Sequence, residues 1–250
     1  MSDLRDQLWD SAVHGKAPTT KGESLSVDQG QTLQLEVLER WLEQGERVAG
    51  YKVGLTSGKA RNAFGPGVRP FGYVLQSRIL HSGETFNAAE VASCGLETEL
   101  VFRLDQALPP REITADDMRS AAASVAPGFE LNQRRLSGDA SRGLRVADNL
   151  SQWGIVVGEF TPAEKIDLAN LKVELLLDDH LVESISGSGH IDDHFASLAT
   201  LANRLRKFGR DLVVGDLVIT GSFTRQAITK TAAWRGVFKT LGEVTVRVKS

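Results

Sequence analysis

The N-terminal part of the chain has the hydrophobic spacing of α-helices. An apolar residue at every fourth position predicts a short helix over residues 3–14. Ser26 and Gln29 have the Ser-x-x-Gln form of a capping box, which satisfies the free amides at a helix start. A second helix is predicted from there to about Gln44. Residues 1–47 are therefore expected to form an N-terminal helical portion.

The rest of the chain is dominated by short runs of branched and aromatic residues, bounded by glycine and proline, which indicate β-strands. The runs are 48–54, 71–75, 95–102, 127–131, 154–158, 171–177, 181–185, 217–221 and 243–248. Helices are predicted over 114–125 and after a cap at Asp192 or Asp193. No repeat or long linker divides the chain, so one unit is expected over 1–250, with its core in 48–250.

The strand predicted at 95–102 carries two acidic residues on one face. Strand side chains alternate, so Glu97 and Glu99 point the same way and Thr98 points the other way. Two adjacent buried carboxylates repel each other, and a hard divalent cation would relieve that repulsion. A solvent-facing polar side explains the same spacing, and Glu-x-Glu alone favours this alternative.

Two further charged residues interrupt hydrophobic segments. Lys52 has small or apolar residues on both sides, and beside an anionic or metal-bound ligand it could act as acid, base or anion clamp. A surface lysine whose ammonium group reaches the solvent is the alternative. Glu130 stands between Phe129 and Leu131, so it faces away from both, and it could equally be exposed.

Composition excludes several classes of partner. The chain has 250 residues, of which 41% are hydrophobic and 24% charged, and its net charge is -3. Without a dense Lys/Arg run, nucleic acid or an anionic membrane is not expected as the main partner, and no apolar run reaches the roughly 20 residues of a membrane span.

Residues 1–5 lack the basic head and apolar run of a signal peptide. Cys94 stands alone, which excludes an internal disulfide, and we expect a core cysteine and a cytoplasmic protein.

Eight segments, in their order along the chain, carry a resemblance to one family. They are Gly45-Glu46-Arg47-Val48 through Gly54-Leu55-Thr56-Ser57, Glu97-x-Glu99, Pro127 to Glu130 with Arg135, Val146-Ala147-Asp148-Asn149-x-Ser151, Leu201-Ala202-Asn203, Gly215-Asp216, Thr220-Gly221-Ser222 and Leu241-Gly242-Glu243-Val244. Together they resemble the 2-oxo-4-pentenoate (2-hydroxypentadienoate) hydratases and 4-oxalocrotonate decarboxylases of the fumarylacetoacetate hydrolase superfamily. The resemblance rests on order and spacing over nearly the whole chain, because no single motif is decisive.

The resemblance implies an α+β fold with a mixed β-roll core, flanking helices and an N-terminal helical portion. It also implies Mg²⁺ or Mn²⁺ held by Glu97, Glu99 and Glu130, where the metal would chelate the carboxylate and 2-oxo oxygens of a 2-oxo acid. Lys52 corresponds to the family's lysine near the substrate and would assist proton transfer or charge stabilisation.

Other site residues follow from the same resemblance. It implies that Arg135, Ser151 and Leu75 bind the substrate, although Arg135 could equally tie down a loop. We expect a metal-dependent lyase of aromatic meta-cleavage type, a hydro-lyase or a carboxy-lyase, acting on a small 2-oxo acid. The alternatives are a C–C hydrolase or tautomerase of the same superfamily, or a non-catalytic partner subunit. A homo-oligomer is expected, and association with a related enzyme of the pathway is a further option.

Four departures from the family pattern surround the expected substrate tail. Ser77 and Gln133 stand where the family has acidic residues, and 229–232 replaces an expected Gly-Asp pair. His194 lies where a Gly-x-Pro turn is usual. One hypothesis is that His194 activates water, and the alternative is a helix-cap or surface histidine. These departures leave the substrate tail, and hence the reaction, open.

Overall fold

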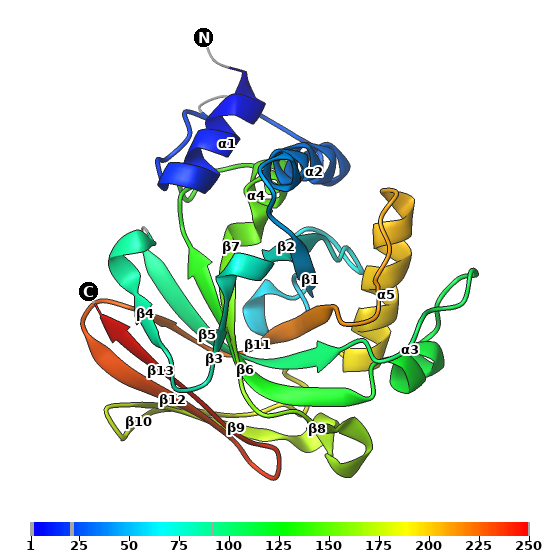
Figure 1. Ribbon diagram of the computed structural model, residues 1–250, viewed down its shortest axis with the longest axis vertical. Coiled ribbons are helices and arrows are strands. Elements are labelled where there is room, and N and C mark those ends of the chain that lie inside the picture. Colours follow the sequence, from blue (N-terminus) through cyan, green and yellow to red (C-terminus); the bar gives the residue numbers. More distant parts are fainter. Residues whose placement is uncertain (1–2, 21–22, 92, 250) are drawn as a thin grey trace.

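Five α-helices and two β-sheets make up the part of the chain that the computed structural model describes, residues 3–20, 23–91 and 93–249 (Figure 1). Predictions that fall on positions 1, 2, 21, 22, 92 and 250 lie outside the described residues. The helices are α1 (Leu4–His14), α2 (Val27–Glu43), α3 (Ala115–Ala121), α4 (Arg142–Ala147) and α5 (His194–Lys207). The strands are β1 (Val48–Val53), β2 (Phe71–Leu75), β3 (Ile79–His81), β4 (Thr85–Asn87), β5 (Cys94–Arg103), β6 (Ser124–Gln133), β7 (Gln152–Val157), β8 (Thr161–Pro162), β9 (Lys172–Leu177), β10 (His180–Ser186), β11 (Leu217–Ala227), β12 (Ala232–Phe238) and β13 (Gly242–Lys249).

The larger sheet is mixed and has β5 and β6 at its centre. Its order is β2-β1-β11-β5-β6-β7-β3, with β8 paired to β6. The central pairs are antiparallel, whereas β1 with β11 and β3 with β7 are parallel. The second sheet, β10-β9-β12-β13-β4, packs on the first, and α1 and α2 lie at the opposite end of the molecule (Figure 1). This arrangement is the mixed β core with flanking helices and an N-terminal helical portion that the resemblance implied.

Both faces of the central strands are buried, but against different neighbours. Leu96, Leu100 and Phe102 on one face of β5 belong to the main hydrophobic core between the sheets. On the other face, Val101 and Ala126 belong to a smaller hydrophobic cluster. The acidic residues lie further along this second face, because they share its strand parity. The site is therefore built on strands that are packed from both sides.

Helix α2 begins at the predicted capping box. Ser26 Oγ accepts a hydrogen bond from Gln29 N at 3.2 Å, and Gln29 Oε1 accepts one from Ser26 N at 2.9 Å. The helix packs on α4, which the sequence did not indicate. At their contact, a Cβ on Gly30 would lie 2.0 Å from the carbonyl oxygen of Gly143. Two residues without side chains thus set how closely the helical portion approaches the rest of the fold.

Two predicted elements differ from the structure. The helix predicted over 114–125 ends at Ala121, and 124–133 forms β6. The alanines before this strand favour a helix, but Val125 packs into the core as part of the sheet, and tertiary packing overrides that preference. The strand predicted at 127–131 is consequently the second half of a longer one. Strand β12 escaped prediction because its buried positions alternate with half-buried ones and form no apolar run.

Two expectations from composition are also resolved. Cys94 is buried, as expected of a core residue. Within the described residues, none of the helices has the length and apolar character needed to cross a membrane.

The contact between α2 and α4 yields a prediction about stability. Gly30→Ala would normally stabilise a helix by about 1 kcal/mol. Here we expect it to lower the free energy of unfolding by about 1–3 kcal/mol, because the new methyl group overlaps the Gly143 carbonyl. Urea denaturation of the variant beside Thr32→Ala, an exposed position on the same helix, would measure this. A Gly30→Ala variant as stable as the control would contradict the packing described.

Candidate metal centre

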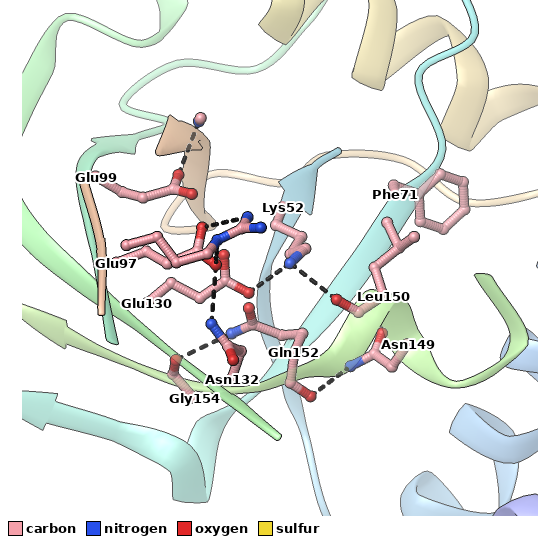
Figure 2. A network of polar contacts seen from close by, with 12 residues as sticks. Lys52, Phe71, Glu97, Glu99, Glu130, Asn132, Asn149, Leu150, Gln152 and Gly154 are labelled. Atoms are coloured by element: carbon pink, nitrogen blue, oxygen red, sulfur yellow. Dashed lines mark hydrogen bonds and ion pairs between the residues drawn. The ribbon is translucent and has the colours of Figure 1, made fainter. Parts of the chain in front are cut away.

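The register of neighbouring strands brings three carboxylates together. Glu97 of β5 lies directly opposite Glu130 of β6, and Glu99 lies opposite Gly128. One carboxylate oxygen from each glutamate lies within 4.8 Å of those of the other two. Figure 2 shows all three side chains extending to the same side of the sheet, toward Lys52. The strand prediction for Glu97 and Glu99 is confirmed, and Glu130 joins them from the adjacent strand.

All three glutamates are buried, which excludes the solvent-facing alternative. Their exposed fractions are 5% for Glu97, 4% for Glu99 and 1% for Glu130. Burial, followed by the nearby charges of Glu130 and Glu97, raises the pKa of Glu99 well above its usual range. Burial also raises the pKa of Glu130, an effect that the ammonium group of Lys52 opposes and the carboxylate of Glu97 reinforces. Like charges opposite one another in a sheet are destabilising, so the cluster requires positive charge.

Lys52 supplies part of that charge. Its Nζ forms an ion pair with Glu130 Oε1 and donates a hydrogen bond to the carbonyl oxygen of Leu150 at 3.1 Å (Figure 2). The side chain is only 12% exposed, so the alternative of a solvated surface lysine is wrong. Lys52 reaches this position because β1, which pairs with β2 on one edge, joins the central strands through β11 on its other edge.

Glu97 has partners from two other strands. Arg225 of β11 lies opposite it, with Nε 2.6 Å from Glu97 Oε1 and a terminal nitrogen 3.0 Å from Oε2. Asn132 Nδ2 donates a hydrogen bond to Glu97 Oε1 at 2.9 Å. Arginine contacts both carboxylate oxygens, and the Glu97 charge raises the pKa of Arg225 further.

The cluster fits a hard divalent cation. Three buried carboxylates face two cationic side chains, Lys52 and Arg225, and Glu99 is left with a hydrogen bond from the backbone amide of Gly221 at 2.7 Å. The ligand set is entirely oxygen, which suits Mg²⁺, Mn²⁺ or Ca²⁺. In the described part of the chain, this is the group of acidic, histidine and cysteine side chains that could hold a metal ion.

A cavity of about 520 Å³ opens beside these residues. Lys52, Glu97 and Glu130 form one part of its wall, and Ser151, predicted to bind the substrate, lines it as well. The lining also includes Asn132, Arg134, Leu136, Gly138, Arg145, Leu150 and Arg225. The carboxylate cluster is therefore accessible to a small molecule.

A strained turn forms one edge of this cavity. Asn149, Leu150 and Ser151 have φ angles of 52°, 51° and 64°, in the left-handed region that residues with side chains rarely adopt. The turn is held by the Asn149 amide group, which accepts from Tyr73 N at 2.8 Å and donates to Tyr73 O at 3.0 Å. The strain has a structural effect, since it turns the Leu150 carbonyl toward Lys52.

Besides Glu99 and His194, three predicted site residues lie outside the lining of this cavity. Arg135 is buried and forms an ion pair with Asp148 at 2.8 Å, and it donates to the carbonyl oxygen of Ser11 at 3.1 Å, so its contacts are those of the loop-fixing alternative. Leu75 is part of the main hydrophobic core. Ser77 donates a hydrogen bond to Glu46 near the surface. Of the residues predicted to bind the substrate, the structure thus brings only Ser151 to the cavity.

His194 lines a different cavity. It is the first residue of α5, it is buried, and its Nδ1 lies 2.8 Å from Thr220 Oγ1. The helix cap is Asp193, so both alternatives for a non-catalytic His194, a cap and a surface residue, are wrong. The second cavity has a volume of about 780 Å³ and shares no lining residue with the first. His194 therefore does not face the cavity beside Glu97 and Glu130, although its partner Thr220 precedes Gly221, whose amide donates to Glu99.

Known proteins resemble this chain over most of its length. It is 29% identical to 2-hydroxypent-2,4-dienoate hydratase from Pseudomonas putida over 84% of the chain and 97% of that protein. It is 25% identical to 4-oxalocrotonate decarboxylase from a Pseudomonas species over 90% of the chain and 88% of that protein. No protein-family model matches the chain.

Solved structures have the same fold. That of 4-oxalocrotonate decarboxylase from Pseudomonas putida G7, complexed with magnesium and adipate, gives a TM-score of 0.89 at 21% identity, over 98% of this chain and 95% of that one. The resemblance to the hydratase and decarboxylase family is confirmed. Fumarylpyruvate hydrolase from Pseudomonas aeruginosa, complexed with Mn²⁺ and pyruvate, gives a TM-score of 0.61 at 18% identity, over 80% and 88% of the two chains. The present chain therefore shares the fold of these two proteins.

The family resemblance did not point to several cavity residues. Asn132 and Arg134 follow Glu130 at intervals of two, so the strand period could have placed them on the same face. The position of Arg225 in the site could not be predicted from the sequence, because it depends on the long-range pairing of β5 with β11. Arg145 lies on α4, a short helix without a sequence signal strong enough to predict it.

Burial of His194 predicts a pH dependence of stability. Burial lowers the pKa of His194 to about 4. The unfolded chain binds a proton near pH 6.5 and the folded one does not, so stability is lost as the pH falls from about 6.5 toward 4. Between pH 7 and pH 5 this residue should cost about 2 kcal/mol of unfolding free energy. His194→Asn, which keeps a polar atom near Thr220, should remove that part of the loss. Denaturation at both pH values would measure it, and equal losses in both proteins would contradict the assignment.

Proposed function

We propose that this protein is a divalent-metal-dependent lyase acting on a small 2-oxo acid, as a hydratase of 2-hydroxydienoates or a decarboxylase of the oxalocrotonate type. The observation that carries the proposal is the convergence of Glu97, Glu99 and Glu130 with Lys52 at one wall of a cavity. The names of the similar proteins, which include hydratases and a decarboxylase, support the same reaction class.

In this proposal Glu97, Glu99 and Glu130 hold Mg²⁺ or Mn²⁺. The magnesium and manganese complexes of the structural neighbours support this choice of metal. A bound divalent cation would stabilise the negative charge that develops when a 2-oxo acid enolises. The remaining chemistry falls to the chain's own residues.

Lys52 is the proposed proton-transfer group. Its ammonium group has three donors and contacts two acceptors among the described residues, Glu130 and Leu150, so one donor is left for a substrate. The Lys52 side chain is largely buried, which strengthens its electrostatic effect on an anionic substrate. Ser151 lines the same cavity and is retained as a substrate-binding residue.

The alternative of C–C hydrolysis has less support. Its proposed water-activating residue, His194, lines the other cavity. Arg135 and Leu75 remain predictions as substrate-binding residues, because their contacts are with the protein interior. The expected homo-oligomer, a pathway partner enzyme and a cytoplasmic location also remain predictions.

Metal binding should stabilise the protein. After treatment with EDTA, addition of Mg²⁺ or Mn²⁺ at about 100 times its dissociation constant should contribute about 2.7 kcal/mol, which raises Tm by about 5–10 °C. Glu99→Gln should lose this metal-dependent rise in Tm. Its metal-free form should nevertheless be at least as stable as the metal-free wild type, because one of three repelling carboxylates is removed. Glu112→Gln, at an exposed position, should keep the shift. An unchanged metal response in Glu99→Gln would count against the proposed ligand set.

Lys52→Met tests the proposed proton-transfer group. We expect turnover to fall by about 10²-fold or more, while the metal-dependent rise in Tm persists. Wild-type protein incubated with 2-hydroxydienoates and with oxalocrotonate, followed by dienol absorbance and CO₂ release, distinguishes hydration from decarboxylation. Normal turnover in Lys52→Met would remove Lys52 from the mechanism. An absence of turnover with every 2-oxo acid tested would contradict the lyase proposal.

A further inference from the structure

The cavity beside the metal centre carries more basic than acidic side chains. Its lining includes four basic residues, Lys52, Arg134, Arg145 and Arg225, and two acidic ones, Glu97 and Glu130. Lys52 and Arg225 are already paired with these two acids. The other two arginines therefore have no acidic partner in the cavity wall.

Arg145 is held in place without being neutralised. A terminal nitrogen donates to the carbonyl oxygen of Gly138 at 2.6 Å and lies 3.5 Å from that of Ser137. Asp139 is close enough for Arg145 to contribute to the lowering of its pKa, but it lies outside the cavity lining. Among the described residues, the contacts of Arg145 are these carbonyl oxygens, and it makes no ion pair within 4.0 Å. Its charge is thus positioned by neutral groups and remains available.

Arg134 continues the row of residues that leads away from the metal centre. Glu130, Asn132 and Arg134 follow at intervals of two along β6 and just beyond its end, and all three line the cavity. Four residues of strand cover about 13 Å, so Arg134 lies further from the carboxylate cluster than the head of a small 2-oxo acid extends. The Arg134 side chain is exposed, and it makes no hydrogen bond or ion pair with the described residues.

We propose that this cavity selects a dicarboxylic 2-oxo acid, whose second carboxylate binds Arg134 and Arg145. The inference rests on the proposed function, because it places the 2-oxo head at the carboxylate cluster. Guanidinium groups bind carboxylates through paired, charge-assisted hydrogen bonds. A neutral tail would leave both arginines to the solvent and gain nothing from them. The two arginines therefore distinguish a diacid from a monoacid of the same length.

A matched pair of ligands tests this selection. 2-Oxohexanedioate and 2-oxohexanoate have the same six-carbon chain and the same head, and they differ in the tail carboxylate. Calorimetric titration of the full chain at fixed Mg²⁺ and low salt should give about tenfold tighter binding of the diacid. High salt should reduce this preference, since the arginines are accessible to ions.

Arg134→Gln should reduce the preference for the diacid about threefold or more, and Arg134→Gln with Arg145→Gln should abolish it. Affinity for the monoacid should stay unchanged in both. Arg142→Gln is the matched control, because Arg142 is an exposed arginine of α4 that donates to the carbonyl oxygen of Phe64 and does not line the cavity. Circular dichroism and Tm would confirm that the double variant folds. If the double variant does not fold, the single variant Arg134→Gln, which breaks no described contact, tests the diacid preference by itself.

Each outcome separates the selection from the underlying function. Equal affinity of the wild type for the two acids, with binding that requires Mg²⁺, overturns the diacid selection and leaves the lyase proposal intact. If Arg134→Gln and Arg142→Gln lose the preference for the diacid equally, the preference comes from overall charge. This result also overturns the diacid selection. Binding of neither acid, with or without Mg²⁺, overturns both proposals.

Discussion

Two carboxylates that face each other across neighbouring buried strands impose the constraint on which the rest of this structure depends. Glu97 and Glu130 occupy paired positions of β5 and β6, in a sheet covered on both faces, so neither can turn to the solvent. Their repulsion would be costly in such surroundings unless opposite charge were placed within contact. Lys52 and Arg225 enter from β1 and β11 to provide it. Strand order therefore follows an electrostatic need as much as hydrophobic packing.

The same arrangement makes the site rigid. Each carboxylate stands on a central strand with hydrogen-bonded neighbours on both sides, and the hydrophobic clusters on the two faces leave the backbone little freedom. The left-handed turn at Asn149–Ser151 stores strain, but it is fixed to β2 through the Asn149 side chain. A ligand would thus meet side chains that are already in position, which reduces the entropy lost on binding.

Sequence patterns captured the local part of this design. The shared face of Glu97 and Glu99, the capping box at Ser26 and most of the longer strands follow from short-range patterns, and the structure confirms them. The resemblance added Glu130 and the fold. What could not be predicted depends on pairing between distant segments: the register that sets Arg225 opposite Glu97, the internal ion pair of Arg135, and the strand that replaces the end of the predicted helix near Val125. The residues that a side chain contacts across a sheet lie on distant segments, so the local sequence around it does not predict them.

The wide sequence separation of the charge partners has a consequence for the order of folding. Lys52 lies 78 residues before Glu130, and Arg225 lies 128 residues after Glu97. The hairpin-like pair of β5 and β6 can form early because its strands are close in sequence, yet its acids gain their cations only when both distant segments have joined the sheet. An intermediate that contains the pair alone would keep these carboxylates hydrated, with this face of the strands open. Burial of the acidic face is thereby postponed until β1 and β11 have docked, which makes closure of the larger sheet a late and cooperative event.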